Sequence, residues 1–155
     1  MNLYKNKISG SIKTPIGIIG IMEENNKIYS LQWTNKVIQS PSPIISNTLL
    51  KISNYFRKKL EINSIPIMLN TTKLQISILK TIMKIPIGKF STYGFIAKKI
   101  NTHPRVVGRT CAINPLPLII PCHRVLRSDK SLGGYSCGKG LKTKMWLLNH
   151  ENVDL

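Results

Sequence analysis

Residues 115–121, Pro-Leu-Pro-Leu-Ile-Ile-Pro, constrain the fold of this 155-residue chain more than any other stretch. Three prolines among seven residues exclude a helix and a central strand, because proline has no amide hydrogen and a fixed φ. The four aliphatic side chains between them are of the kind that proteins bury. We therefore predict an apolar loop here, which forms one wall of a pocket.

The predicted loop ends in a thiol and an imidazole, Cys122 and His123. A thiol with an ordinary pKa of about 8.5 needs a base to become a nucleophile at neutral pH, and an imidazole can take the proton. Neighbouring side chains of an extended chain point in opposite directions, so contact between the two requires a bend or a bridging water. The pair is a candidate nucleophile and base. The alternative is a buried thiol that only packs, beside a surface histidine.

A catalytic base is usually oriented by a third group. After residue 61 the sequence contains only three acidic residues, Asp129, Glu151 and Asp154. Glu151 ends a predicted apolar helix over residues 141–151, which must pack against the core. We therefore predict that Glu151 is the partner of His123, with a solvated helix end as the alternative.

The first part of the chain predicts a small α/β unit over residues 1–66. Residues 16–22 and 27–34 are β-rich, and the Glu-Glu-Asn-Asn between them suits a turn, which together predict an antiparallel hairpin. Apolar residues then recur at helical spacing from residue 44 to residue 60. The following Ile-Asn-Ser-Ile-Pro-Ile-Met-Leu predicts an exit linker.

Residues 67–155 predict a mostly helical second domain. An amphipathic helix follows a threonine cap and stops at Pro86. Thr92 is predicted to cap a second short helix, and Pro104 to open a third. Two short helices joined by a tight turn form a helix-turn-helix. The predicted apolar side of the first helix comprises Leu74, Ile78, Leu79, Ile82 and Met83.

The second helix of this pair has two distinct faces. Two arginines and two very small residues fall on one side at i, i+3, i+4, i+7 spacing, and such a face can approach a phosphate-lined groove closely. A solvated face without function is the alternative. The first side comprises Arg105, Gly108, Arg109 and Ala112, and the opposite side comprises Val107, Thr110 and Cys111.

The charge balance is strongly basic, with 23 Lys and Arg against 6 Asp and Glu, a formal charge of +17 and a pI of about 10.1. Residues 71–155 carry 14 basic and 3 acidic residues (+11), against 9 and 3 (+6) in residues 1–70. Such an excess favours a polyanion partner, most strongly for the second half. A compositional bias of the genome is the alternative explanation for part of it.

The cysteine and histidine pattern indicates neither a disulfide framework nor a metal site. Three cysteines are an odd number, no two form a CxxC pair, and residues 1–102 contain neither cysteine nor histidine. The N-terminus has no apolar signal segment, and no apolar stretch reaches 18 residues. We therefore expect a cytoplasmic monomer without a metal or cofactor and without a membrane partner.

Residues 114–125, Asn-Pro-Leu-Pro-Leu-Ile-Ile-Pro-Cys-His-Arg-Val, resemble the active-site signature of the O6-alkylguanine-DNA alkyltransferases, single-turnover DNA-repair methyltransferases. The resemblance is strong over residues 72–151 and includes the closing segment Leu-Lys-Thr-Lys-Met-Trp-Leu-Leu-Asn-His-Glu. Residues 1–66 match only in outline. The resemblance implies an α/β N-terminal unit, a small antiparallel sheet plus helix that is ribonuclease H-like in outline, followed by a mostly α winged helix-turn-helix domain.

The resemblance also implies a reaction. Cys122 would take a methyl or small alkyl group from O6-alkylguanine in duplex DNA, assisted by a water-linked His123 and by Glu151, with O4-alkylthymine as a further candidate substrate. The thioether is stable, so each molecule would act once. Related proteins that bind lesions without repairing them carry tryptophan where Cys122 stands, and this chain keeps the thiol.

Further roles come with the resemblance, position by position. Arg105 would fill the gap left by a nucleotide flipped through the minor groove. Tyr93 would promote that rotation and hydrogen-bond the ring N3, and Asn114 would brace the turn before the loop. Backbone groups of Cys122, Val125, Tyr135 and Ser136 would bind the base, and the DNA-binding residues would be Arg105, Gly108, Arg109, Ala112 and Thr92.

Two departures from the family pattern affect the pocket. The segment Ser136–Leu141 is two residues longer than in many relatives and adds Cys137 and Lys139 near the lesion. Cys111, on the inner face of its helix, is predicted to belong to the core. A non-catalytic lesion binder and a Cys-His hydrolase are the alternative functions.

Overall fold

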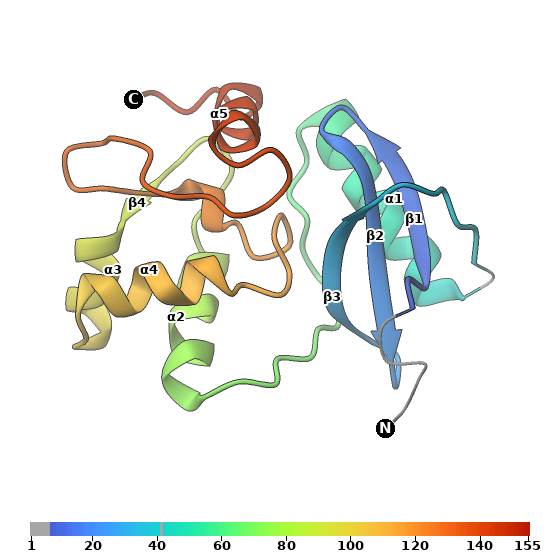
Figure 1. Cartoon of the computed structure of the whole chain (residues 1–155), viewed down its shortest axis with the longest axis horizontal. Coiled ribbons are helices and arrows are strands. Elements are labelled where there is room, and N and C mark those ends of the chain that lie inside the picture. The colour runs from blue at the N-terminus through green and yellow to red at the C-terminus, as the bar shows by residue number, and fades with distance from the viewer. Residues whose placement is uncertain (1–6, 41) are drawn as a thin grey trace. The chain divides into compact units, whose positions relative to one another are not determined.

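The computed structural model describes residues 7–40 and 42–155 (Figure 1). The chain divides into two compact units, Met1–Leu69 and Asn70–Leu155. The first contains a three-stranded sheet and a helix, and the second is mainly helical. This confirms the predicted order of an α/β unit followed by a helical domain.

The sheet of the first unit is antiparallel, in the order β1 (Gly10–Thr14), β2 (Gly17–Glu24), β3 (Lys27–Thr34). The predicted hairpin is confirmed, but its turn is only Asn25 and Asn26, both with positive φ (52° and 58°), as a two-residue hairpin turn requires. β1 was not predicted from the sequence, because its Gly-Ser-Ile-Lys-Thr is short and lacks a run of β-formers.

The helix of the first unit, α1 (Pro43–Lys58), ends at Lys59, whose left-handed backbone closes the last turn. A methyl group on Gly10 of β1 would lie 2.4 Å from Ile45 Cγ2, so α1 approaches β1 closely. The buried apolar residues of the unit come from both layers: Ile19, Ile21, Ile28, Leu31, Ile45, Ile52 and Tyr55.

The predicted exit linker is partly wrong, because it pairs with the sheet. Ile28 of β3 donates its amide to Pro66 O (2.8 Å) and accepts from the Met68 amide (2.9 Å), which forms a parallel bridge between Ile28 and Ile67. These hydrogen bonds hold the segment against β3. The sequence predicts a boundary after residue 66, whereas the compact units divide after Leu69.

The second unit contains α2 (Lys73–Met83), α3 (Tyr93–Ile100), α4 (Pro104–Ala112) and α5 (Leu141–His150). The predicted threonine caps are confirmed: Thr72 Oγ1 accepts from the Gln75 amide (3.2 Å), and Thr92 Oγ1 accepts from the Phe95 amide (3.1 Å). α3 packs against α4, and α2 contacts both helices. α3 and α4 are therefore the predicted helix-turn-helix pair.

The buried apolar side of α2 is shorter along the helix than predicted. Ile78, Leu79 and Ile82 are buried, but Leu74 and Met83 are 41% and 39% exposed. The two exposed residues lie in the first and last turns of the helix, so only its middle packs into the core.

The proline-rich stretch is a buried loop, as predicted, but the prediction that it forms a pocket wall is wrong, because none of residues 115–121 lines the cavity described below. Leu116, Leu118, Ile119 and Ile120 are all at most 4% exposed. A short 3₁₀ turn, η1 (Cys122–Arg124), follows the loop and leads into β5 (Val125–Leu126), which pairs in parallel with β4 (Ser91–Thr92). The end of the loop is thereby fixed beside the start of α3.

No helix among residues 7–40 and 42–155 is long and apolar enough to cross a membrane.

Thr72→Ala should lower the free energy of unfolding by about 1 kcal/mol, because the first turn of α2 loses the side chain that accepts its amide hydrogen. Urea denaturation followed by circular dichroism measures this loss. Lys80→Ala, on the exposed part of the same helix, is the control and should change stability by about 0.5 kcal/mol or less. Equal losses in both variants would contradict the cap assignment.

Candidate active site

A cavity of about 710 Å³ lies in the second unit, between the helix-turn-helix pair, η1 and the segment that precedes α5. Seven of the residues predicted for the site line it: Tyr93, Arg105, Gly108, Ala112, Cys122, Tyr135 and Ser136. The remaining predicted residues, which do not line the cavity, are Thr92, Arg109, Asn114, His123, Val125 and Glu151.

The thiol of Cys122 is at the buried end of this cavity, and the residue is 3% exposed. Burial raises the pKa of the thiol to about 11, although the side chain of Asn114 and the charge of Lys144 oppose this rise. The resting residue is therefore a neutral thiol. For this sulfur to act as a nucleophile, its proton would have to pass to a base before or during the attack.

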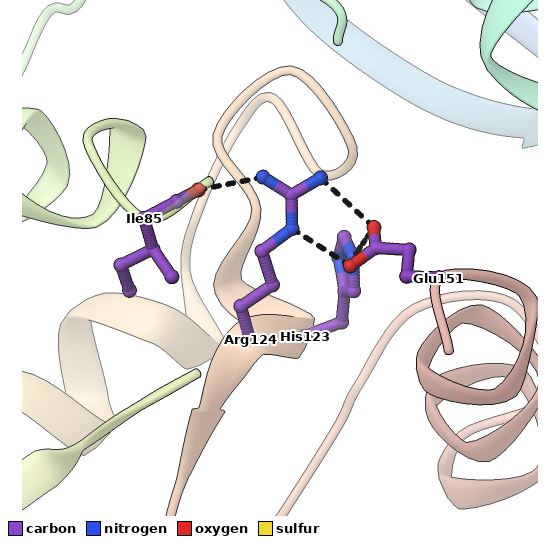
Figure 2. Close-up of polar contacts among 4 residues, drawn as sticks. All are labelled: Ile85, His123, Arg124 and Glu151. Carbon is purple, nitrogen blue, oxygen red and sulfur yellow. Dashed lines mark hydrogen bonds and ion pairs between the residues drawn. The ribbon is translucent and has the colours of Figure 1, made fainter. Parts of the chain in front are cut away.

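His123 is oriented by Glu151. His123 Nε2 lies 2.7 Å from Glu151 Oε1, and both side chains are buried (Figure 2). Burial lowers the pKa of His123 despite the opposing hydrogen bond and charge of Glu151, so the imidazole is neutral near pH 7. A neutral ring that donates its Nε2 hydrogen to a carboxylate keeps Nδ1 as a proton acceptor.

The chain turns at η1, which contains both residues of the Cys-His pair. In the part of the chain that the structure describes, no hydrogen bond joins Cys122 to His123, and the buried His123 Nδ1 makes none. The acceptor nitrogen of the base is thus not engaged by another protein group. The 3₁₀ turn therefore does not bring the Cys122 thiol and the His123 imidazole into a direct hydrogen bond.

Arg124 is a site residue that was not identified from the sequence. Its Nε donates to Glu151 Oε2 and its Nη2 to Glu151 Oε1, both at 2.9 Å, and its Nη1 donates to Ile85 O at 2.6 Å (Figure 2). Burial raises the pKa of Glu151, but hydrogen bonds from His123 and Arg124 outweigh it and lower the pKa to about 2. The carboxylate is therefore charged, and it holds two side chains at once.

A signal for Arg124 was present in the sequence. A cation directly after a buried histidine needs an acidic partner, and the second half of the chain offers only three acids.

Asn114 lies where it can hold both ends of the apolar loop. Its Nδ2 donates to Ile120 O and its Oδ1 accepts from the Leu116 amide, both at 2.9 Å. The amide side chain is buried, and these two bonds engage both its nitrogen and its oxygen. Asn114 thus sets the shape of the loop that leads into Cys122.

Lys144 is a second site residue that was missed. It is fully buried, and its Nζ donates to Val125 O (2.8 Å), Leu132 O (2.5 Å) and Gly134 O (3.3 Å). Burial lowers its pKa to about 8, with the nearby thiols opposing the shift. The helical pattern of α5 could not reveal it, because a lysine inside an apolar helix is ordinarily a surface residue.

Tyr93 lies within reach of this lysine, whose Nζ is 5.9 Å from the centre of the phenol ring. Burial, followed by the nearby thiols Cys111 and Cys122, raises the pKa of Tyr93 to about 12. The phenol is neutral at pH 7 and can donate its hydrogen to a ligand in the cavity.

The outer face of α4 has the composition predicted for close approach. Arg105, Arg109 and Ala112 are exposed, and a Cβ on Gly108 would meet no atom within 4 Å. No neighbour within the protein therefore requires glycine at this position. Ser136 Oγ donates to Ala112 O (3.1 Å), which ties the segment before α5 to the end of this helix.

The prediction that Cys111 belongs to the core is wrong. The residue is only half-buried and lines the cavity together with Cys122. The cavity runs along the side of α4 rather than along its outer face alone, so a position between the two faces borders it. Burial and the neighbouring Cys122 raise the pKa of Cys111 to about 12, so this thiol is also neutral.

The stability of the protein should depend on pH through Glu151. Its pKa is lowered on folding, so its contribution is complete above about pH 4.5 and is lost as the pH falls towards 2. A shift of this size corresponds to about 3 kcal/mol. In urea denaturation the stability of the wild type should fall steeply below pH 4.5, whereas Glu151→Gln should be less stable at pH 7 and should lose less on acidification. Asp154→Asn is the control; parallel curves for the wild type and Glu151→Gln would contradict the assignment.

Comparison with protein families and structures identifies relatives over nearly the whole chain. The family model described as 6-O-methylguanine DNA methyltransferase, DNA binding domain, matches residues 73–153. The methylated-DNA–protein-cysteine methyltransferase of Saccharolobus solfataricus is 37% identical over 150 residues, which cover 96% of this chain and 97% of the relative. The enzyme of the same name from Metallosphaera sedula is 36% identical over 141 residues, 88% of each chain.

Solved structures agree with these matches. A Mycobacterium tuberculosis protein crystallised in complex with DNA superposes with a TM-score of 0.79 at 30% identity and covers 92% of this chain and 91% of its own. An O6-methylguanine DNA methyltransferase from Methanococcus jannaschii gives a TM-score of 0.66 at 33% identity over 94% of each chain. The chain therefore belongs to the methylated-DNA–protein-cysteine methyltransferases, the O6-alkylguanine-DNA alkyltransferase family, which reverses DNA damage by alkyl transfer.

Proposed function

We propose that Cys122 is the alkyl acceptor, that it takes the group irreversibly from O6-alkylguanine flipped out of duplex DNA, and that each molecule acts once as a monomer. The observation that carries this proposal is the buried series of Cys122, neutral His123 and charged Glu151 at the end of the cavity. It supplies a nucleophile, a proton acceptor and a group that orients the acceptor.

The high pKa of Cys122 determines how the nucleophile forms. A pKa of about 11 leaves roughly one thiolate in ten thousand at pH 7, so the proton must move as the attack proceeds. We propose that a water carries it from Sγ to His123 Nδ1, the nitrogen that no protein group engages. Sγ then forms a bond to the alkyl carbon while the bond between that carbon and O6 breaks.

The leaving guanine requires a proton if it is to depart as a neutral base. Tyr93 is a neutral phenol that lines the cavity, so it is placed to donate to the ring N3. The imidazolium formed at His123 is stabilised by Glu151, and its proton can return to the phenolate through water. No net charge then remains on the protein after the transfer.

The cavity wall supports recognition of the flipped base. The cavity is lined by the residue whose backbone carbonyl we propose to accept from the exocyclic amine of guanine, Cys122. Val125, the second carbonyl expected from the family, lies behind the cavity, where its oxygen accepts from Lys144 Nζ. Backbone amides near Tyr135 and Ser136 would donate to O6, since both residues line the cavity. Entry from the minor groove is supported by the open space at Gly108 on the exposed face of α4.

The acceptor should be identified by mass. After incubation with a duplex that contains one O6-methylguanine, the peptide containing Cys122 should gain one methyl group per molecule, and a second addition of duplex should produce no further gain. Cys111→Ser, which removes the other thiol of the cavity, should react as the wild type does, and Cys122→Ser should not react. Tight binding without any mass gain would indicate a lesion binder instead. The same assay with O4-methylthymine measures whether that base is also a substrate.

Arg105→Ala should affect flipping of the nucleotide from duplex DNA more than alkyl transfer itself. The guanidinium is proposed to occupy the gap left by the flipped nucleotide, so its loss should slow repair of a methylated duplex at least tenfold more than reaction with a free O6-alkylguanine base. Single-turnover rates on both substrates measure the ratio. Equal slowing on both would contradict the proposed role.

A further inference from the structure

Arg127 lines the cavity but has no part in the mechanism described above. It follows β5 and is exposed, and within residues 7–40 and 42–155 its guanidinium makes no hydrogen bond or ion pair. Its backbone, by contrast, is held in a turn: its amide donates to Ser131 O (3.0 Å), and its carbonyl accepts from the Lys130 amide (2.8 Å). The backbone position of this cation is thus held, while its five N–H donors make no hydrogen bond in the described part of the chain.

The nearby acid Asp129 forms no ion pair with this cation in the part of the chain that the structure describes. Its Oδ1 accepts from both the amide (2.9 Å) and the hydroxyl (2.6 Å) of Ser131. These hydrogen bonds, followed by the more distant charge of Arg127, lower the pKa of Asp129. The described lining of the cavity contains two arginines, Arg105 and Arg127, and no Asp or Glu. A ligand that enters this cavity therefore meets a net positive rim, which favours an anionic group.

The different depths of Cys122 and Arg127 in the cavity determine which part of a ligand can reach each of them. Cys122 is buried at one end, whereas Arg127 is exposed at the mouth. A nucleotide that reaches the thiol with its base must leave its sugar and phosphates at the mouth. Ser128 also lines this rim, and a Cβ on Gly94 would lie 3.3 Å from its hydroxyl, so the rim beside Arg127 lies close to the start of α3.

Resting on the proposed function, we propose that Arg127 binds a backbone phosphodiester of the flipped nucleotide and thereby holds the extrahelical base in the cavity. The planar guanidinium can donate two parallel hydrogen bonds to a phosphate, a geometry that lysine cannot reproduce. The role differs from the one proposed for Arg105, which lies on α4 and would occupy the gap left in the duplex.

The experiment removes the charge from each partner in turn. Equilibrium binding is measured in a Cys122→Ser background with duplexes that carry O6-methylguanine and one neutral methylphosphonate, placed either 5′ or 3′ of the lesion. With Arg127 present, one of the two neutral linkages should weaken binding about tenfold. The Arg127→Ala variant should bind the O6-methylguanine duplex without a methylphosphonate about tenfold more weakly than the protein with Arg127 does. In this variant the same methylphosphonate should weaken binding little further. The dependence of log Kd on log salt should also decrease by about 0.9 in this variant.

Two controls make the outcome specific. Lys130→Ala removes a cation of the same turn, whose Nζ lies 5.9 Å from the centre of the Phe90 ring and which does not line the cavity. Binding by this variant should still be weakened by the methylphosphonate. Arg127→Lys keeps the charge and should recover only part of the affinity. If each methylphosphonate weakens binding equally with Arg127 and with Arg127→Ala, the phosphate assignment is overturned. Reaction of wild-type Cys122 with a free O6-alkylguanine base tests the proposed function separately.

Discussion

The carboxylate of Glu151 is the group on which the site depends. It accepts one hydrogen bond from His123 and two from Arg124, and Arg124 extends the network to the carbonyl of Ile85 beyond the end of α2. Three segments that are distant in sequence therefore meet at one buried charge. Without the carboxylate the guanidinium would be buried and unpaired, which typically costs about 3–5 kcal/mol, and the imidazole would lose its orientation. The same carboxylate thus stabilises the buried arginine and orients the imidazole.

Burial controls the protonation of the other groups around the cavity. It raises the pKa of Cys122 and Tyr93 and lowers that of His123, so all three are neutral at pH 7. A neutral thiol is a poor nucleophile, so the resting Cys122 is protected from unrelated electrophiles. In the proposed mechanism the thiol becomes reactive when its proton passes to His123 while a substrate occupies the cavity. Arg127, at the exposed mouth, acts before this step in our proposal, since it concerns the position of the nucleotide.

Local patterns in the sequence predicted much of the fold. The hairpin, the two threonine caps and the helix-turn-helix pair each depend on residues within one turn or one strand, and these predictions are confirmed. β1, the pairing of residues 66–68 with β3 and the exposure of Leu74 depend on distant partners, so local patterns did not reveal them. Cys111 shows the same limit, because its burial is decided by a cavity that no helical periodicity describes.

By itself, the sequence determined the buried proline-rich loop, the position of a thiol next to an imidazole, and the shortage of acids that pointed to Glu151. These follow from side-chain chemistry and from order along the chain. Only the tertiary structure decided that Arg124 shares Glu151, that Lys144 binds three carbonyls inside the domain, and that Arg127 makes no hydrogen bond or ion pair with the described residues at the mouth of the cavity. The physical reason is that charge, burial and hydrogen bonding belong to positions in space. Residues 124 and 151 are far apart in sequence, and packing alone places the two ions in contact.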